Sequence, residues 1–238
     1  MMITILAIET SADAAFAALL QGARCFVAQS AGVETHSTTI LPMVQDVLKQ
    51  AQLSLADCDA IAYGAGPGSF TGVRTACGVT QGLAFGANKP VVPIVSLLAM
   101  AQLCKEETGA HEVCALLDAR MGEVYWAHYR YDERWHVVVE PTLSAVSDIQ
   151  CADKPDIVLC GNGLIEYQEL ILKHAVLARC KNKFSHIMPT AKAVAQLAQV
   201  AFELGDTVLP SQARPVYLRN HVAKTIKERE AEKENKNG

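Results

Sequence analysis

The chain has 238 residues, half of them apolar, and its 21 Lys and Arg against 25 Asp and Glu give a net charge of −4. This length suffices for two compact domains of roughly 100 residues each, and the acidic balance argues against a stand-alone tRNA-binding module. No stretch approaches the roughly 18 apolar residues of a membrane span, and the first ten residues lack the basic start of an export signal. We therefore expect a cytoplasmic protein without membrane contact.

The first residues predict an antiparallel meander followed by a helix. Residues 2–9, 14–20 and 23–29 are apolar runs at hairpin spacing, and Gly22 marks the second turn. Apolar residues then recur with helical spacing over about 40–52, after a His-Ser-Thr-Thr run that can cap the helix. We expect Pro42 to lie in the first turn of that helix, where proline is tolerated.

The glycine-rich middle of the first half predicts a strand, a turn and a second helix. Residues 59–63 form a buried strand, and a helix over 72–86 begins with Thr71 as its cap. The half ends with a strand and a helix at 90–95 and 96–107.

The same order of elements returns in the second half. Three strands at 113–118, 123–131 and 135–140 precede a polar helix near 144–151 and a strand at 156–160. No elements are assigned beyond this strand until a last helix.

Aligning the halves places Glu9 opposite Asp118 and Gly64 opposite Gly161. Two such β-β-β-α-β units are the layout of the actin, sugar-kinase and Hsp70 superfamily (ASKHA). A Rossmann fold would instead place a helix directly after the first strand. The sequence therefore predicts a two-domain, actin-like α/β fold with duplicated βββαβ units.

The predicted domains are 1–107, which carries the candidate interface helices, and 108–221. The last helix, at 190–204, is stopped by Gly205, and its packing back on the first domain is left open. Residues 222–238 form a mixed-charge tail with too few apolar residues to pack, so we expect disorder there.

Cysteine and histidine spacing predicts no metal site. The eight cysteines are scattered without a C-x-x-C pair, and no two of the seven histidines lie three or four residues apart. No G-x-S-x-G motif is present. We therefore expect reduced, buried cysteines and no catalytic residues.

The segment GAGPGSFTGVR, from Gly64 to Arg74, lies at the junction of a strand and a helix. Free backbone N–H groups at the helix N-terminus favour an anion, which makes phosphate binding one interpretation. The lysine of a G-x-x-x-x-G-K-[ST] loop is absent. A tight turn that only glycine can make is the other interpretation.

Both predicted helices of the first half have features of an interface. Gly78, Gly82 and Gly86 lie four apart on one helix face, and each costs about 0.5–1 kcal/mol relative to Ala. Such a stripe lets another backbone approach closely, either from the protein's own sheet or from another subunit. The helix at 40–52 carries more apolar surface than one sheet contact needs, which favours a partner.

Glu9 and Asp118 end corresponding strands, where actin-like phosphotransferases place carboxylates near metal and phosphates. An actin-like ATPase or small-molecule kinase that uses both with Mg²⁺ is therefore an alternative function. The second hairpin turn carries Arg120 and Met121 instead of a glycine- and threonine-rich phosphate loop, so we interpret the cleft as vestigial. Its predicted residues are Glu9, Thr10, Ser11, Gly66, Gly68, Ser69 and Asp118.

Several segments resemble the bacterial TsaB family, also called YeaZ, up to about residue 221. They are LAIETS at 6–11, HSTTILPMVQDVL at 36–48, YGAGPGSFTGVRTACGVTQGLA at 63–84, LLDARMGEVYWA at 116–127 and PVYLRN at 215–220. The resemblance implies a non-catalytic paralogue of TsaD, the subunit that transfers threonylcarbamoyl to the adenosine beside the tRNA anticodon. It implies binding to TsaD, a complex that also holds the TsaE ATPase, self-pairing when isolated, tRNA contact only through the complex, and no cofactor.

The resemblance also implies that the helices at about 40–52 and 72–86 contact TsaD as a helical bundle. The metal-binding H-x-x-x-H of TsaD falls near 96–100 here, where the chain reads Ser-Leu-Leu-Ala-Met. Glu9 stands where the family usually has Asp, and Ala65 where some members carry Arg, which weakens a nucleotide site. The predicted interface residues are Ile40, Leu41, Met43, Val44, Val47, Leu48, Ala51, Arg74, Thr75, Gly78, Val79, Gly82, Phe85 and Gly86.

Overall fold

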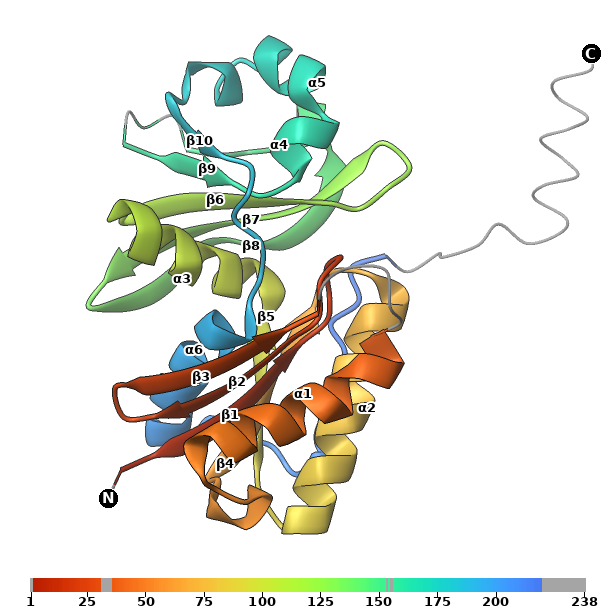
Figure 1. The fold of residues 1–238 in the computed structure, drawn as a ribbon. Helices are drawn as coiled ribbons and strands as arrows, with labels where there is room; N and C mark the ends of the chain where they lie inside the picture. The colour runs from red at the N-terminus through yellow and green to blue at the C-terminus, as the bar shows by residue number, and fades with distance from the viewer. Residues whose placement is uncertain (1, 31–35, 153, 155, 220–238) are drawn as a thin grey trace, which may run out of the picture.

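Two five-stranded sheets form the body of the computed structural model, which describes residues 2–30, 36–152, 154 and 156–219 (Figure 1). The first sheet consists of β1 (Thr4–Glu9), β2 (Phe16–Gln21), β3 (Arg24–Gln29), β4 (Ala60–Gly66) and β5 (Val91–Val95). The second consists of β6 (Glu112–Asp118), β7 (Glu123–Asp132), β8 (Arg134–Ala145), β9 (Val158–Cys160) and β10 (Asn182–Phe184). The predicted tail at 222–238 lies outside the described residues.

The two sheets have the same topology. The strand orders are β3-β2-β1-β4-β5 and β8-β7-β6-β9-β10. In each sheet the first three strands pair antiparallel, and the fourth runs parallel to the first and to the fifth. The predicted duplication is therefore confirmed for the order and direction of the strands.

Helices cover the sheets on both faces. They are α1 (His36–Ala51), α2 (Phe70–Ala87), α3 (Ser96–Thr108), α4 (Gly163–Glu166), α5 (Gln168–Lys173) and α6 (Ala191–Glu203). None of the helices in the described part of the chain has the length and apolar character to cross a bilayer.

Alternate residues of β1 enter two separate cores. Leu6 and Ile8 pack with α1 and α2 on one face of the sheet, whereas Ile5 and Ala7 pack with α6 and α3 on the other. A strand buried on both faces reads as a continuous apolar run because successive side chains point to opposite sides. The packing of the last helix was left open by the sequence. In the structure this helix, α6, packs on the first sheet (Figure 1).

Helix α3 is shared by the two halves of the fold. Ala99 packs into the core beneath the first sheet, and Leu97, Met100 and Cys104 pack into the core of the second sheet. Because one rigid element contributes to both cores, the halves are joined by packing as well as by the chain (Figure 1).

The predicted starts of two helices are corrected. Helix α1 begins at His36, so Pro42 lies inside it rather than in its first turn. The helix continues because burial of its apolar face outweighs the backbone hydrogen bond that proline lacks. Helix α2 begins at Phe70, and its cap is Ser69, whose Oγ accepts a hydrogen bond from the backbone N–H of Gly72. Thr71, the predicted cap, lies within the helix.

The helix predicted near 144–151 is absent. Strand β8 continues to Ala145, paired with β7, and Trp126 Nε1 donates a 3.0 Å hydrogen bond to Ser144 Oγ. Only a 3₁₀ turn, Val146–Asp148, follows. Cross-strand pairing within the β7–β8 hairpin therefore overrides a weak local preference for helix.

The pairing of the first strand with the fourth differs by two residues between the two sheets. In the first sheet Gly64 lies beside Glu9, the last residue of β1. In the second sheet Gly161 lies beside Leu116, so Asp118 at the end of β6 extends two residues further past its neighbour strand. The alignment of the halves was therefore correct for the order of the elements but not for their register.

The glycine-rich segment is a tight junction against the end of β1. A Cβ built on Gly64 would overlap the carboxyl group of Glu9, and one built on Gly72 would overlap the carbonyl oxygen of Thr10. Thr10 Oγ1 also donates a 2.7 Å hydrogen bond to the carbonyl of Gly72. The structure thus supports the interpretation in which glycine permits a close backbone approach.

Substituting glycine within α2 should have opposite effects at two positions. Gly72→Ala is expected to destabilise the fold by at least about 2 kcal/mol because its Cβ overlaps backbone. Gly78→Ala, the control, meets no atom within 4 Å and should stabilise the helix by about 0.5–1 kcal/mol. Denaturant unfolding of the purified chain measures both, and equal stability of the two variants would contradict the close approach.

Candidate functional site

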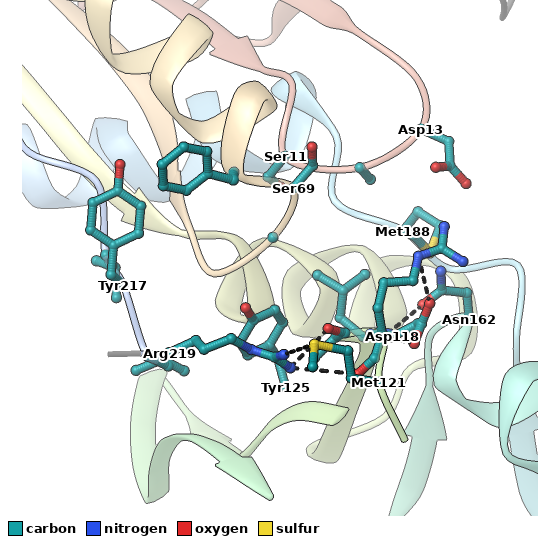
Figure 2. A pocket seen from close by; sticks show the side chains of 18 residues that line it. Ser11, Asp13, Ser69, Asp118, Met121, Tyr125, Asn162, Met188, Tyr217 and Arg219 are labelled. Carbon is teal, nitrogen blue, oxygen red and sulfur yellow. Dashed lines mark hydrogen bonds and ion pairs between the residues drawn. The ribbon is translucent and has the colours of Figure 1, made fainter. Parts of the chain in front are cut away.

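A cavity of about 380 Å³ lies between the two halves of the fold, where β1 and β6 end (Figure 2). Its walls come from the segment after β1, the loop before α2, the β6–β7 hairpin and residues 216–219. Of the predicted cleft residues, Ser11, Gly68, Ser69 and Asp118 line this cavity.

Asp118 is held in place by neighbouring groups. Its Oδ1 accepts hydrogen bonds from the backbone N–H of Arg120 at 2.8 Å and from Tyr167 Oη at 2.7 Å. Its Oδ2 pairs with Arg120 Nε at 3.2 Å, and its own N–H donates to Asn162 Oδ1 at 2.9 Å. Burial and the nearby carboxylate raise the pKa of Tyr167 to about 12, so this phenol stays a donor at neutral pH. The carboxylate is therefore compensated by the protein itself.

Glu9 is fully buried and does not face the cavity. Its Oε1 accepts a 2.5 Å hydrogen bond from the N–H of Ser11, and its Oε2 accepts one from Ser96 Oγ at 3.1 Å. Burial raises the pKa of this carboxyl above its ordinary value, against the lowering effect of these hydrogen bonds. The prediction that Glu9, Thr10 and Gly66 face the cleft is wrong, because all three are buried at the ends of β1 and β4 and do not line the cavity.

The outer face of α2 is open. Built Cβ atoms on Gly78, Gly82 and Gly86 meet nothing within 4 Å, and Phe85 beside them is 82% exposed. Of the two partners that the sequence allowed for this glycine stripe, the protein's own sheet is thus excluded. A large exposed aromatic next to bare helix backbone is unusual on a surface without a partner.

Comparison with known proteins identifies the family. A protein-family model described as TsaD, tRNA N6-adenosine threonylcarbamoyltransferase, matches residues 25–229. The chain is 39% identical to the Escherichia coli K12 protein named tRNA threonylcarbamoyladenosine biosynthesis protein TsaB, over 92% of this chain and 96% of the relative. A Haemophilus influenzae protein with the same name is 36% identical, over 92% and 95%. The chain belongs to the TsaB (YeaZ) family.

Solved structures of the TsaB family agree with the fold. The crystal structure described as YeaZ from Pseudomonas aeruginosa has a TM-score of 0.81 and 35% identity, over 91% of this chain and all of that one. A second structure, described as an uncharacterized protein with similarity to peptidase YeaZ from the same organism, has a TM-score of 0.85 and 36% identity over the same shares. The predicted actin-like fold class is confirmed.

The exposed apolar surface of α1 is smaller than predicted. Most predicted interface residues of this helix are buried against the protein's own sheet, because the wide apolar stripe packs on both the strands and α2. They are Ile40, Met43, Val44, Val47 and Ala51. Leu48 of α1 and Val79 of α2 are half-buried against the same core. Leu41 of α1, by contrast, is 45% exposed. The predicted surplus of exposed apolar surface on α1 is therefore wrong.

The C-terminal segment 216–219 is a part of the cavity that sequence reasoning missed. Val216, Tyr217, Leu218 and Arg219 form one wall (Figure 2). The signal was present, since PVYLRN was among the segments that resemble the TsaB family, but nothing local shows that it returns to the end of β1.

Both arginines that line the cavity are paired with carboxylates, whereas Asp13, which also lines it, has no ion-pair partner among the described residues. Arg120 pairs with Asp118, and Arg219 pairs with Glu123. Among residues 2–30, 36–152, 154 and 156–219, no three His, Cys, Asp or Glu side chains gather in a metal-binding arrangement. The kinase alternative requires Glu9 and Asp118 to bind one metal ion. Asp118 lines the cavity, but Glu9 is buried away from it, so one of the two ligands is missing there.

The buried carboxyl of Glu9 should make stability depend on pH. Its folded pKa is raised above the ordinary value of 4.5, so its favourable contribution is fully present below pH 4.5 and is lost as pH rises through the folded pKa. Glu9→Gln does not titrate. We expect the melting temperature of Glu9→Gln relative to the parent chain to rise with pH from 4.5 upward.

Calorimetric melting of both proteins from pH 4 to 8 measures this difference. Glu169→Gln, which removes an exposed carboxylate on α5, is the control for the loss of one negative charge and should show no such trend. A Glu9→Gln difference that stays constant or shrinks with pH would show that the carboxyl is not held at a burial cost.

Proposed function

We propose that this TsaB-family chain is a non-catalytic subunit in the biosynthesis of threonylcarbamoyladenosine on tRNA. In this proposal it binds the catalytic subunit TsaD in the cytoplasm, within a complex that also contains the TsaE ATPase. The isolated chain pairs with itself through the same face, and it meets tRNA only through the complex. The printed names of its relatives and the match to the TsaD family model support the pathway.

The open face of α2 is the observation that carries the proposal. Gly78, Gly82 and Gly86 weaken an isolated helix, and no side chain or backbone of the described chain packs on them. The exposed ring of Phe85 near the end of α2 and the exposed side chain of Arg74 near its start are an aromatic and an arginine, the kinds of residue enriched at interfaces. A helix of another subunit can approach such a face closely.

The buried end of β1 supports a subunit without its own activity. Glu9, Ser11 and Ser96 bond to one another, with Ser11 Oγ donating to Ser96 Oγ at 2.9 Å. Ser96 begins the segment where the resemblance places the metal-binding histidines of TsaD, and Leu97 and Met100 of that segment are core residues. These positions are thus used for structure.

Bulk on the open face of α2 should weaken binding to TsaD. Gly82→Leu adds a side chain where the partner helix would lie, and we expect at least a tenfold rise in Kd, about 1.4 kcal/mol. Calorimetric titration with purified TsaD, followed by a tRNA modification assay with and without the chain, measures the effect. Val200→Phe, on the exposed side of α6 across the sheet, is the matched control and should bind normally.

Two further outcomes sharpen the assignment. Leu41→Glu places a charge at the exposed apolar position of α1 and should also weaken binding if both helices contact TsaD. A charge at Val44, which is 2% exposed, would report on folding and not on the interface. If Gly82→Leu still binds and supports modification at the parent level, the α2 face is not the docking surface.

A further inference from the structure

Residues 213–219 are fastened to the first half of the fold by side-chain and backbone bonds. Tyr63 Oη donates a 2.8 Å hydrogen bond to the carbonyl of Arg214, and the N–H of Val216 donates to the carbonyl of Ala65 at 2.7 Å. Tyr63 and Ala65 both belong to β4, which is buried throughout. The segment is therefore anchored on a rigid strand.

The next residue connects the segment to α2. Arg74 Nε donates a 2.7 Å hydrogen bond to Tyr217 Oη, and the guanidinium carbon of Arg74 lies 3.7 Å from the centre of the Phe70 ring. The rings of Phe70 and Tyr217 are 5.8 Å apart. A cation over one ring and a hydrogen bond to the next make a stack that couples the first turns of α2 to the segment.

Arg219 lines the cavity and contacts the β6–β7 hairpin (Figure 2). Its Nη2 pairs with Glu123 Oε2 at 2.7 Å and donates to the carbonyls of Ala119 at 3.0 Å and Arg120 at 3.4 Å. Arg120 and Met121 in this turn have φ values of +62° and +59°, a conformation that costs energy for residues with a side chain. Hydrogen bonds from a guanidinium fork to the turn offset that cost.

Within the described residues the chain crosses between the halves after α3 and again after β10. We propose that residues 213–219 form a third, non-covalent connection: a strap that ties α2 to the β6–β7 hairpin and fixes the opening of the cavity. Arg219 is its latch on the second half, and Tyr217 is its link to α2. If α2 also docks TsaD, which rests on the proposed function, occupation of the α2 face and the state of the hairpin are coupled through Arg74.

Hydrogen exchange of the isolated chain tests the strap. The hairpin amides of Ala119 and Glu123 donate to carbonyls within the turn, so they report on its opening. Arg219→Ala should speed their exchange by about tenfold or more, because the latch is lost. Tyr217→Phe keeps the ring but removes the oxygen that accepts from Arg74, and should speed the same amides by roughly threefold.

Lys154→Ala is the matched control. It removes an ion pair with Glu112, at the other end of β6 from the hairpin, and should leave hairpin exchange unchanged. Should Arg219→Ala fail to fold, Arg219→Lys, which keeps the charge but not the fork, should still accelerate hairpin exchange.

Unchanged hairpin exchange in a folded Arg219 variant would overturn the latch. Acceleration by Arg219→Ala but not by Tyr217→Phe would overturn the link to α2. Because these measurements use the chain alone, they are independent of whether Gly82→Leu binds TsaD.

Discussion

The close approach between the end of β1 and the glycine-rich segment is the constraint on which the rest of the structure depends. Gly64 leaves room for the carboxyl of Glu9, and Gly72 leaves room for the carbonyl of Thr10. With these contacts the loop passes directly over the strand end, and α2 begins at the cavity. A side chain at either glycine would move the helix and everything that packs on its first turns.

That placement gives α2 two different faces. One face joins α1 and the first sheet in a common core, through Ala76, Cys77 and Ala84. The other face carries Gly78, Gly82 and Gly86, on which no other part of the described chain packs, and the exposed ring of Phe85. Function in this TsaB-family chain is thus best sought on a helix surface, because both arginines that line the cavity are already held in ion pairs.

Long elements with clear periodicity could be predicted from the sequence, and most short ones could not; the three-residue strand β9, in an apolar run that ends at Gly161, is an exception. The meanders and α2, α3 and α6 followed from runs of apolar residues, whereas α4, α5 and β10 were missed because three to six residues carry no measurable period. The helix predicted near 144–151 failed because β8 continues to Ala145 in pairing with β7, and this cross-strand pairing is not visible in the periodicity of a single segment. The prediction of which α1 residues are exposed also failed, because Val44 and Val47 pack in the core against the first sheet.

The sequence by itself determined the duplicated α/β fold, the family and the glycine stripe, since each is written in local pattern and spacing. Only the tertiary structure decided what those residues face. A two-residue difference in register buries Glu9 and exposes Asp118 to the cavity. The return of residues 213–219 to β4 and their reach to the β6–β7 hairpin likewise depend on bonds between residues about 100 or more positions apart, which no local pattern specifies.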